Sequence, residues 1–241
     1  MHTLRYFRTP VWLSGWLLSA GLSLLLISPL HAQQDEISAE ELERWFNSDS
    51  LEPPRYKEVN EGQLVFLSGK QDKTLHHHHN SVTILPHSLE DGWILIKQCH
   101  SNIDRVAAAQ VLFKAERVKN IKILSTHHIE KAWVEGASVQ MENIGAAATI
   151  CLQANTRSLE READGTYRLH NGPFMRRFLD GYFPLRVSLD LNYEQTNLEL
   201  TDFQPMVQAG FAVTRSEGKL HLDTVFEGKL RTEFHFRIKR L

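Results

Sequence analysis

The sequence predicts a mainly β protein: an antiparallel β-sandwich, built as one large unit or as two packed Ig-like units, with one amphipathic helix before it. Apolar and polar residues alternate over most of the chain after residue 62, which is typical of half-buried strands. Short polar turns at Asp91-Gly92, at Glu135-Gly136 and at residues 143–145 separate the alternating stretches. Before these stretches, the apolar residues that follow Ser38 are spaced as on one face of a helix.

The N-terminus has the pattern of a secretory signal peptide. Arg5 and Arg8 precede an uncharged, mostly apolar run over residues 9–30, and Ala32 supplies a small residue at a cleavage position. We therefore expect export and removal of residues 1–32. The alternative is an uncleaved anchor, because about 20 apolar residues can span a bilayer. Export predicts a periplasmic or secreted protein that keeps no stable transmembrane segment after cleavage.

A helix and a proline-rich connector are expected over residues 33–56. Ser38 and Glu41 have the spacing of a capping box, and Leu42 and Trp45 begin an apolar face. Two consecutive prolines then favour an extended connector. The helix would form a lid packed on the sheet or, as the alternative, a segment that binds a partner.

The remaining chain is divided into a first β-sandwich domain over residues 57–172 and a crossover segment with a C-terminal β-sandwich unit over residues 173–241. Asp164-Gly165 marks a hairpin turn, and residues 171–183 suggest a short helix or a structured crossover. The C-terminal unit is marginal alone at about 57 residues, so we expect it to pack on the first unit or to complete its sheets. The expected strands of the first domain cover residues 63–67, 81–85, 93–99, 109–113, 121–126, 131–135, 138–142, 148–154, 158–162 and 166–169.

The two cysteines, Cys99 and Cys151, are expected to form a disulfide. Both lie in alternating segments that read as strands, and disulfides persist outside the cytoplasm. A bridge between them would contribute about 4 kcal/mol in the chain-entropy model. Free thiols or metal ligands are the alternatives. Because the flanking residues are polar, the pair is expected on the more polar face of its sheet.

Histidines are the one unusual chemical feature, 13 in all. The candidate metal ligands are His76, His77, His78, His79 and His100, and neutral imidazole binds zinc or copper. In an extended run, however, alternate side chains point to opposite faces, so each face offers only two ligands. Incidental metal capture and a solvated polar loop or strand edge are the other interpretations. The nearby pair at residues 127 and 128 is expected in a polar turn after residue 126.

A second candidate site lies in the crossover segment. Arg176, Arg177 and Tyr182 stand among several other aromatic residues, and guanidinium groups can bind a carboxylate or phosphate while rings stack on an apolar face. The structural alternative is that the aromatic residues fill the core and that Asp180 pairs with an arginine.

Composition and motifs argue against several classes of function. The formal net charge is −2, so the chain lacks the excess of positive charge with which proteins bind nucleic acid. The sequence contains no serine elbow, phosphate loop or zinc-protease motif. We expect a non-enzymatic, exported protein that binds an envelope protein, a polysaccharide or a small ligand, or that assists envelope assembly. A zinc or copper protein that uses the histidine run and an envelope-polymer hydrolase are the alternatives, and no cofactor is expected outside the metal-binding case.

Overall fold

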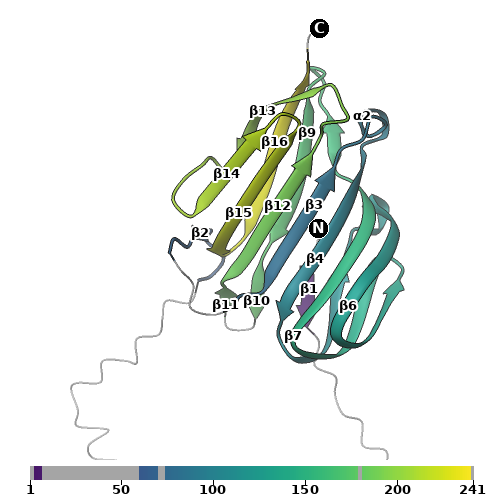
Figure 1. The fold of residues 1–241 in the computed structure, drawn as a ribbon, viewed down its shortest axis with the longest axis vertical. Coiled ribbons are helices and arrows are strands. Elements are labelled where there is room, and N and C mark those ends of the chain that lie inside the picture. The colour runs from purple at the N-terminus through teal and green to yellow at the C-terminus, as the bar shows by residue number, and fades with distance from the viewer. Residues whose placement is uncertain (1–2, 7–59, 70–73, 179–180, 240–241) are drawn as a thin grey trace, which may run out of the picture. The chain divides into compact units, whose positions relative to one another are not determined.

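Two sheets packed face to face make up most of the described chain, which in this computed structural model comprises residues 3–6, 60–69, 74–178 and 181–239 (Figure 1). The mainly β class is therefore confirmed. The predicted helix near Ser38 lies outside the described residues, as does most of the predicted leader. Two short helical turns, α2 (Ser88–Asp91) and η1 (Ala115–Arg117), interrupt the strands.

The larger sheet has ten strands, and all of its neighbouring pairs but one are antiparallel. The exception is the parallel pair β3 (His77–Thr83) and β12 (Leu185–Asn192). The main path runs β1 (Thr3–Tyr6), β5 (Val106–Leu112), β7 (Ser138–Arg157), β4 (Trp93–Ile103), β3, β12, β15 (Lys219–Glu227) and β14 (Phe211–Ser216), with β2 (Val65–Phe66) on β15 and β6 (Val118–Glu135) on β7.

The smaller sheet has four strands, in the order β13 (Leu198–Gln204), β16 (Leu230–Ile238), β9 (Tyr167–Phe174) and β8 (Leu159–Arg161). Alternate residues of each sheet face the other sheet and form one core. Phe234 and Phe236 of β16 are fully buried, and the Phe236 ring packs edge-on against Tyr193 at 5.2 Å between centroids. Each such side chain contributes about 1.5–3 kcal/mol through burial.

The C-terminal segment completes both sheets. β12, β14 and β15 join the larger sheet, whereas β13 and β16 join the smaller one. Between β9 and β12, the described residues form β10 (Arg176–Phe178) and β11 (Gly181–Phe183), which pair as a hairpin. The short helix considered for this region is therefore wrong.

Two expected turns lie within continuous strands instead. β6 and β7 run unbroken through the polar residues at 127–128 and 143–145, so the predicted turns at these places were wrong. His128 and Asn143 have φ values of 55° and 53°. The pairing register shifts between His127 and Ile129, which marks a β-bulge at His128 that does not end the strand.

The predicted disulfide is confirmed. Cys99 of β4 lies directly opposite Cys151 of β7, and the two sulfurs are bonded across a sequence separation of 52. Both residues are half-buried on the face that carries Lys97 and Gln153, the more polar face expected from the sequence. The bond ties together two neighbouring strands of the larger sheet.

Replacement of both cysteines, Cys99→Ser with Cys151→Ser, should lower the free energy of unfolding by about 2–4 kcal/mol, because the unfolded chain regains the entropy that the closed loop removes. Urea denaturation under oxidising conditions measures the change. Reduced wild-type protein should match the variant. Equal stability of the variant and the oxidised wild type would contradict the prediction.

Candidate functional site

The histidine run lies at the centre of the larger sheet, not in a loop or at a strand edge. β3 pairs with β4 on one side and with β12 on the other, so the polar-loop interpretation was wrong. Strand alternation divides the run between two faces, as expected. His76 and His78 point into the sandwich and are buried, whereas His77 and His79 are half-buried on the outer face.

The inner imidazoles form part of a buried polar cluster. Gln98 Nε2 donates to His100 Nε2 at 3.0 Å, and His100 Nδ1 lies 3.2 Å from His76 Nε2. With this orientation of the amide, His100 carries its proton on Nδ1 and donates it to His76. Three of the five predicted metal ligands, His76, His78 and His100, thus come together inside the sandwich.

His78 is held by a second set of contacts. Its Nε2 lies 3.3 Å from Asn80 Oδ1, and Asn80 Nδ2 donates to Asn171 Oδ1 of β9 at 3.1 Å. The ring also meets Phe174 edge to face, with 4.9 Å between centroids. These contacts connect the histidine strand to the smaller sheet.

Burial keeps the inner imidazoles neutral. The pKa of His76 is lowered to about 3, mainly by burial and in addition by the nearby His78 and Arg176. Burial also holds the pKa of His78 well below its usual value, with His100 as the next cause. A neutral ring can hydrogen-bond inside a core, whereas a charged one would be strongly disfavoured there.

Among the described residues, no group of three or more histidine, cysteine, aspartate and glutamate side chains has an arrangement that could hold a metal ion. Each inner imidazole already contacts a polar neighbour, and His77 and His79 lie on the opposite face of the strand. A site that uses all five predicted ligands would have to span both faces. The predicted zinc or copper site stays a prediction.

The outer face carries a hydrogen-bonded array across β3, β12 and β15. Ser188 Oγ lies 2.7 Å from both His77 Nε2 and His79 Nδ1. His79 Nε2 lies 3.2 Å from Asp190 Oδ2, and His221 Nδ1 lies 2.7 Å from Asp190 Oδ1. No local pattern in the sequence indicates this array, because only the parallel pairing of β3 with β12 places these residues together.

In the array a serine, a histidine and an aspartate are linked in that order by hydrogen bonds, as in the catalytic triad of a serine hydrolase. Ser188, however, is only 4% exposed, and its oxygen is engaged by two imidazoles. A substrate carbonyl would have to displace at least one of these rings to reach the hydroxyl. The geometry therefore favours a structural network that holds three strands together.

The arginines of the second predicted site contact different side chains. Arg176 Nη2 donates to Asp104 Oδ2 at 2.7 Å, whereas the Arg177 guanidinium lies over the Tyr182 ring at 5.6 Å. The Tyr182 side chain itself is buried. The two guanidinium groups therefore do not converge as a fork for one anion. Asp180, the expected partner of an arginine, lies outside the described residues.

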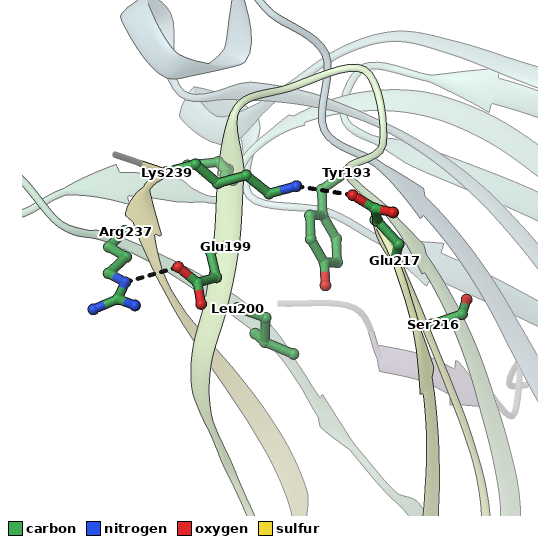
Figure 2. Close-up of a pocket in the computed structure, with 9 residues that line it drawn as sticks. Tyr193, Glu199, Leu200, Ser216, Glu217, Arg237 and Lys239 are labelled. Carbon is green, nitrogen blue, oxygen red and sulfur yellow. Dashed lines mark hydrogen bonds and ion pairs between the residues drawn. The ribbon is translucent and has the colours of Figure 1, made fainter. Parts of the chain in front are cut away.

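An open groove lies where both sheets end on the same side of the sandwich (Figure 2). β13 is the last strand of the smaller sheet and β14 the last strand of the larger one. The groove between them has a volume of about 700 Å³ and an apolar wall that includes Leu198 and Leu200. The Tyr193 ring projects into it (Figure 2), and burial is the main cause that raises the pKa of its hydroxyl.

Two ion pairs border the groove. Arg237 Nε donates to Glu199 Oε2 at 2.9 Å, and Lys239 Nζ donates to Glu217 Oε1 at 3.3 Å (Figure 2). The hydrogen bond from Arg237 is the main cause that lowers the pKa of Glu199. The border thus presents two cations and a carboxylate held in its ionised form. Leu198 and Leu200 alternate with polar residues in the sequence, but no local pattern shows that a groove opens beside them.

Comparison with known proteins gives no family. No family model and no curated protein matches the chain. Among solved structures, an M1 zinc metallopeptidase from Deinococcus radiodurans bound to a Tyr-Ser-Ala substrate has a TM-score of 0.37 and 8% identity, over 70% of this chain and 43% of that one. A two-domain M1 zinc metallopeptidase bound to L-tryptophan has a TM-score of 0.36 and 9% identity, over 70% and 44%. The chain spans less than half the length of either.

No helix within the described residues is both long and apolar enough to cross a membrane. The apolar run of the predicted leader, at residues 9–30, lies outside that part of the chain.

The buried imidazoles predict a loss of stability in acid. Below pH about 6.5 the unfolded chain protonates these histidines while the folded chain keeps them neutral, so the unfolded state binds more protons and is favoured as the pH falls. The free energy of unfolding should decrease by about 1.4 kcal/mol per pH unit for each of His76 and His78. Urea denaturation at pH 7, 6 and 5 measures the slope.

The double variant His76→Leu with His78→Leu is the control for this slope. It should show a shallower dependence on pH, whatever its stability at pH 7, because it lacks the two groups that titrate only after unfolding. An unchanged slope in the double variant, or a wild-type stability that stays constant from pH 7 to 5, would contradict the assignment.

Proposed function

We propose that this chain is an exported, non-enzymatic binding protein of the cell envelope, and that the groove between β13 and β14 holds its ligand. The ligand would be a segment of an envelope protein, a polysaccharide or a smaller molecule. The Ig-like character of the sandwich, the N-terminal helix and the periplasmic or secreted location belong to the same proposal.

The groove is the observation that carries this proposal. It combines an apolar wall at Leu198 and Leu200 with a tyrosine hydroxyl and two ion pairs at its border. Binding sites typically combine apolar surface with a few well-placed polar groups. The strands on both sides are the ends of sheets, so the rigid frame of the sandwich positions the groove while leaving it accessible.

Two observations support a binding role over hydrolysis. A glycosidase needs one carboxylic acid that stays protonated near neutral pH, but Arg237 lowers the pKa of Glu199 in the groove. In the Ser-His-Asp arrangement of the outer array, Ser188 is covered. The groove therefore supports recognition better than bond cleavage.

Export predicts a defined mature N-terminus. The protein recovered from the cell envelope should begin at Gln33, and its two cysteines should be oxidised, because the disulfide forms in an oxidising compartment. Intact-mass measurement with and without reduction tests both points. A protein found in the cytoplasm with its first 32 residues intact and both thiols reduced would contradict export.

Ligand binding in the groove is tested by photo-crosslinking in cells. A photoreactive benzoyl-phenylalanine at Leu200 should give a discrete adduct of higher mass, because it lies in the wall of the groove. The same group at Leu124, which is 49% exposed on β6, is the matched control and should give none. Mass spectrometry of the adduct identifies a protein or polysaccharide partner.

Variants of the border provide a second arm of this test. Glu199→Gln with Glu217→Gln removes both carboxylates and should weaken the Leu200 adduct if the partner contacts the border. Absence of any adduct at Leu200, or equal adducts at Leu200 and Leu124, would contradict the assignment of the groove.

A further inference from the structure

β5 lies between β7 and the first strand of the chain. On one side Gln110 is opposite Gln140 of β7, and on the other side Gln110 is opposite Arg5 of β1. β1 is thus an antiparallel strand that the leader region contributes to the larger sheet. It is the only strand within the described residues that covers this edge of β5.

The backbone groups that face β1 can be assigned from one hydrogen bond. The N–H of Phe113, directly after β5, donates to the carbonyl of Ala137, directly before β7. The backbone groups of odd-numbered residues in β5 therefore point toward β7. Backbone direction alternates along a strand. The N–H and C=O groups of Ala108, Gln110 and Leu112 therefore point to the side occupied by β1.

The exposed edge of β5 would be unprotected without β1. The strand reads Val-Ala-Ala-Ala-Gln-Val-Leu, with no charge and no proline. Native edge strands are usually protected by lysine, proline or bulges. β6 shows that protection, with Lys119, Lys122 and Lys131 along its length and register shifts at three places.

We propose that removal of residues 1–32 uncovers the β5 edge and that a second copy of the processed chain takes the place of β1, so that β5 pairs antiparallel with β5 of the partner. This inference rests on the proposed export and processing. Before processing, β1 blocks the edge. After processing, the two copies satisfy each other's edge groups across a two-fold axis.

A second copy fits this edge for three reasons. β1 shows that the edge admits an antiparallel strand in a regular register. β5 carries no charge, so two copies oppose no like charges. An antiparallel pair about a two-fold axis is closed, because each copy offers one edge and takes one, and this limits assembly to a dimer.

The test begins with the protein recovered from the envelope, with its N-terminus defined by intact mass. Size-exclusion chromatography with light scattering should give the mass of a dimer at micromolar concentration. Ala108→Pro should give a monomer, because proline removes an N–H that points to the partner and leaves the pairing with β7 in place. Ala108→Ser keeps that N–H and is the matched control, which should remain a dimer.

A peptide provides an independent arm in case Ala108→Pro does not fold. The synthetic peptide of residues 1–8, Met-His-Thr-Leu-Arg-Tyr-Phe-Arg, should bind the edge in trans and convert the wild-type dimer into a monomer, whereas a scrambled peptide should not.

Three results would overturn the inference and leave export intact. They are a processed protein that is monomeric, a dimer that resists both the variant and the peptide, and an edge occupied by a different protein. Retention of residues 1–32 would overturn the processing step itself.

Discussion

A strand that carries imidazoles into the interior of a sandwich can be accommodated only while those rings are neutral, and β3 imposes this condition on the fold. Its inner face is closed by Phe174 and Asn171 of the smaller sheet. Its two edges are hydrogen-bonded to β4 and β12. Protonation of His76 or His78 would place an uncompensated charge between the sheets, where the cost exceeds that of most single contacts.

The centre of the larger sheet is therefore structural, and its outer face is structural as well. The outer imidazoles hold Ser188 and Asp190 on β12, while the disulfide fixes β4 against β7. Surface that another molecule could contact lies at the ends of the sheets. One such place is the groove where β13 and β14 end the two sheets, and the other is β5, which only β1 covers among the described strands. A rigid centre with accessible margins fits the proposed binding role.

Local alternation was sufficient to predict most of the strands and the disulfide. Cys99 and Cys151 each stand within a clear alternating segment, so their pairing followed from two local patterns and a count of two thiols. The division of the histidine run between two faces followed from the same alternation. The pairing of strands far apart in the chain has no local sequence signature, so the parallel contact of β3 with β12 and the array at Ser188 could not be predicted. The bulge at His128 and the unbroken strand at Asn143 could not be predicted, because a polar residue with positive φ has the same sequence signature within a strand as in a turn. The groove could not be predicted either, because it depends on where two different sheets end.

Titration of the imidazole groups by nitrogen-15 NMR tests the central claim most directly, since it observes protonation in the folded protein and not its effect on unfolding. In the folded state His76 should keep the chemical shifts of a neutral ring from pH 7 down to the point at which the fold is lost, in keeping with its pKa of about 3. A midpoint for His76 near the ordinary value of about 6.5, in protein that is still folded, would show that the strand tolerates a charged ring inside the sandwich and would contradict the account.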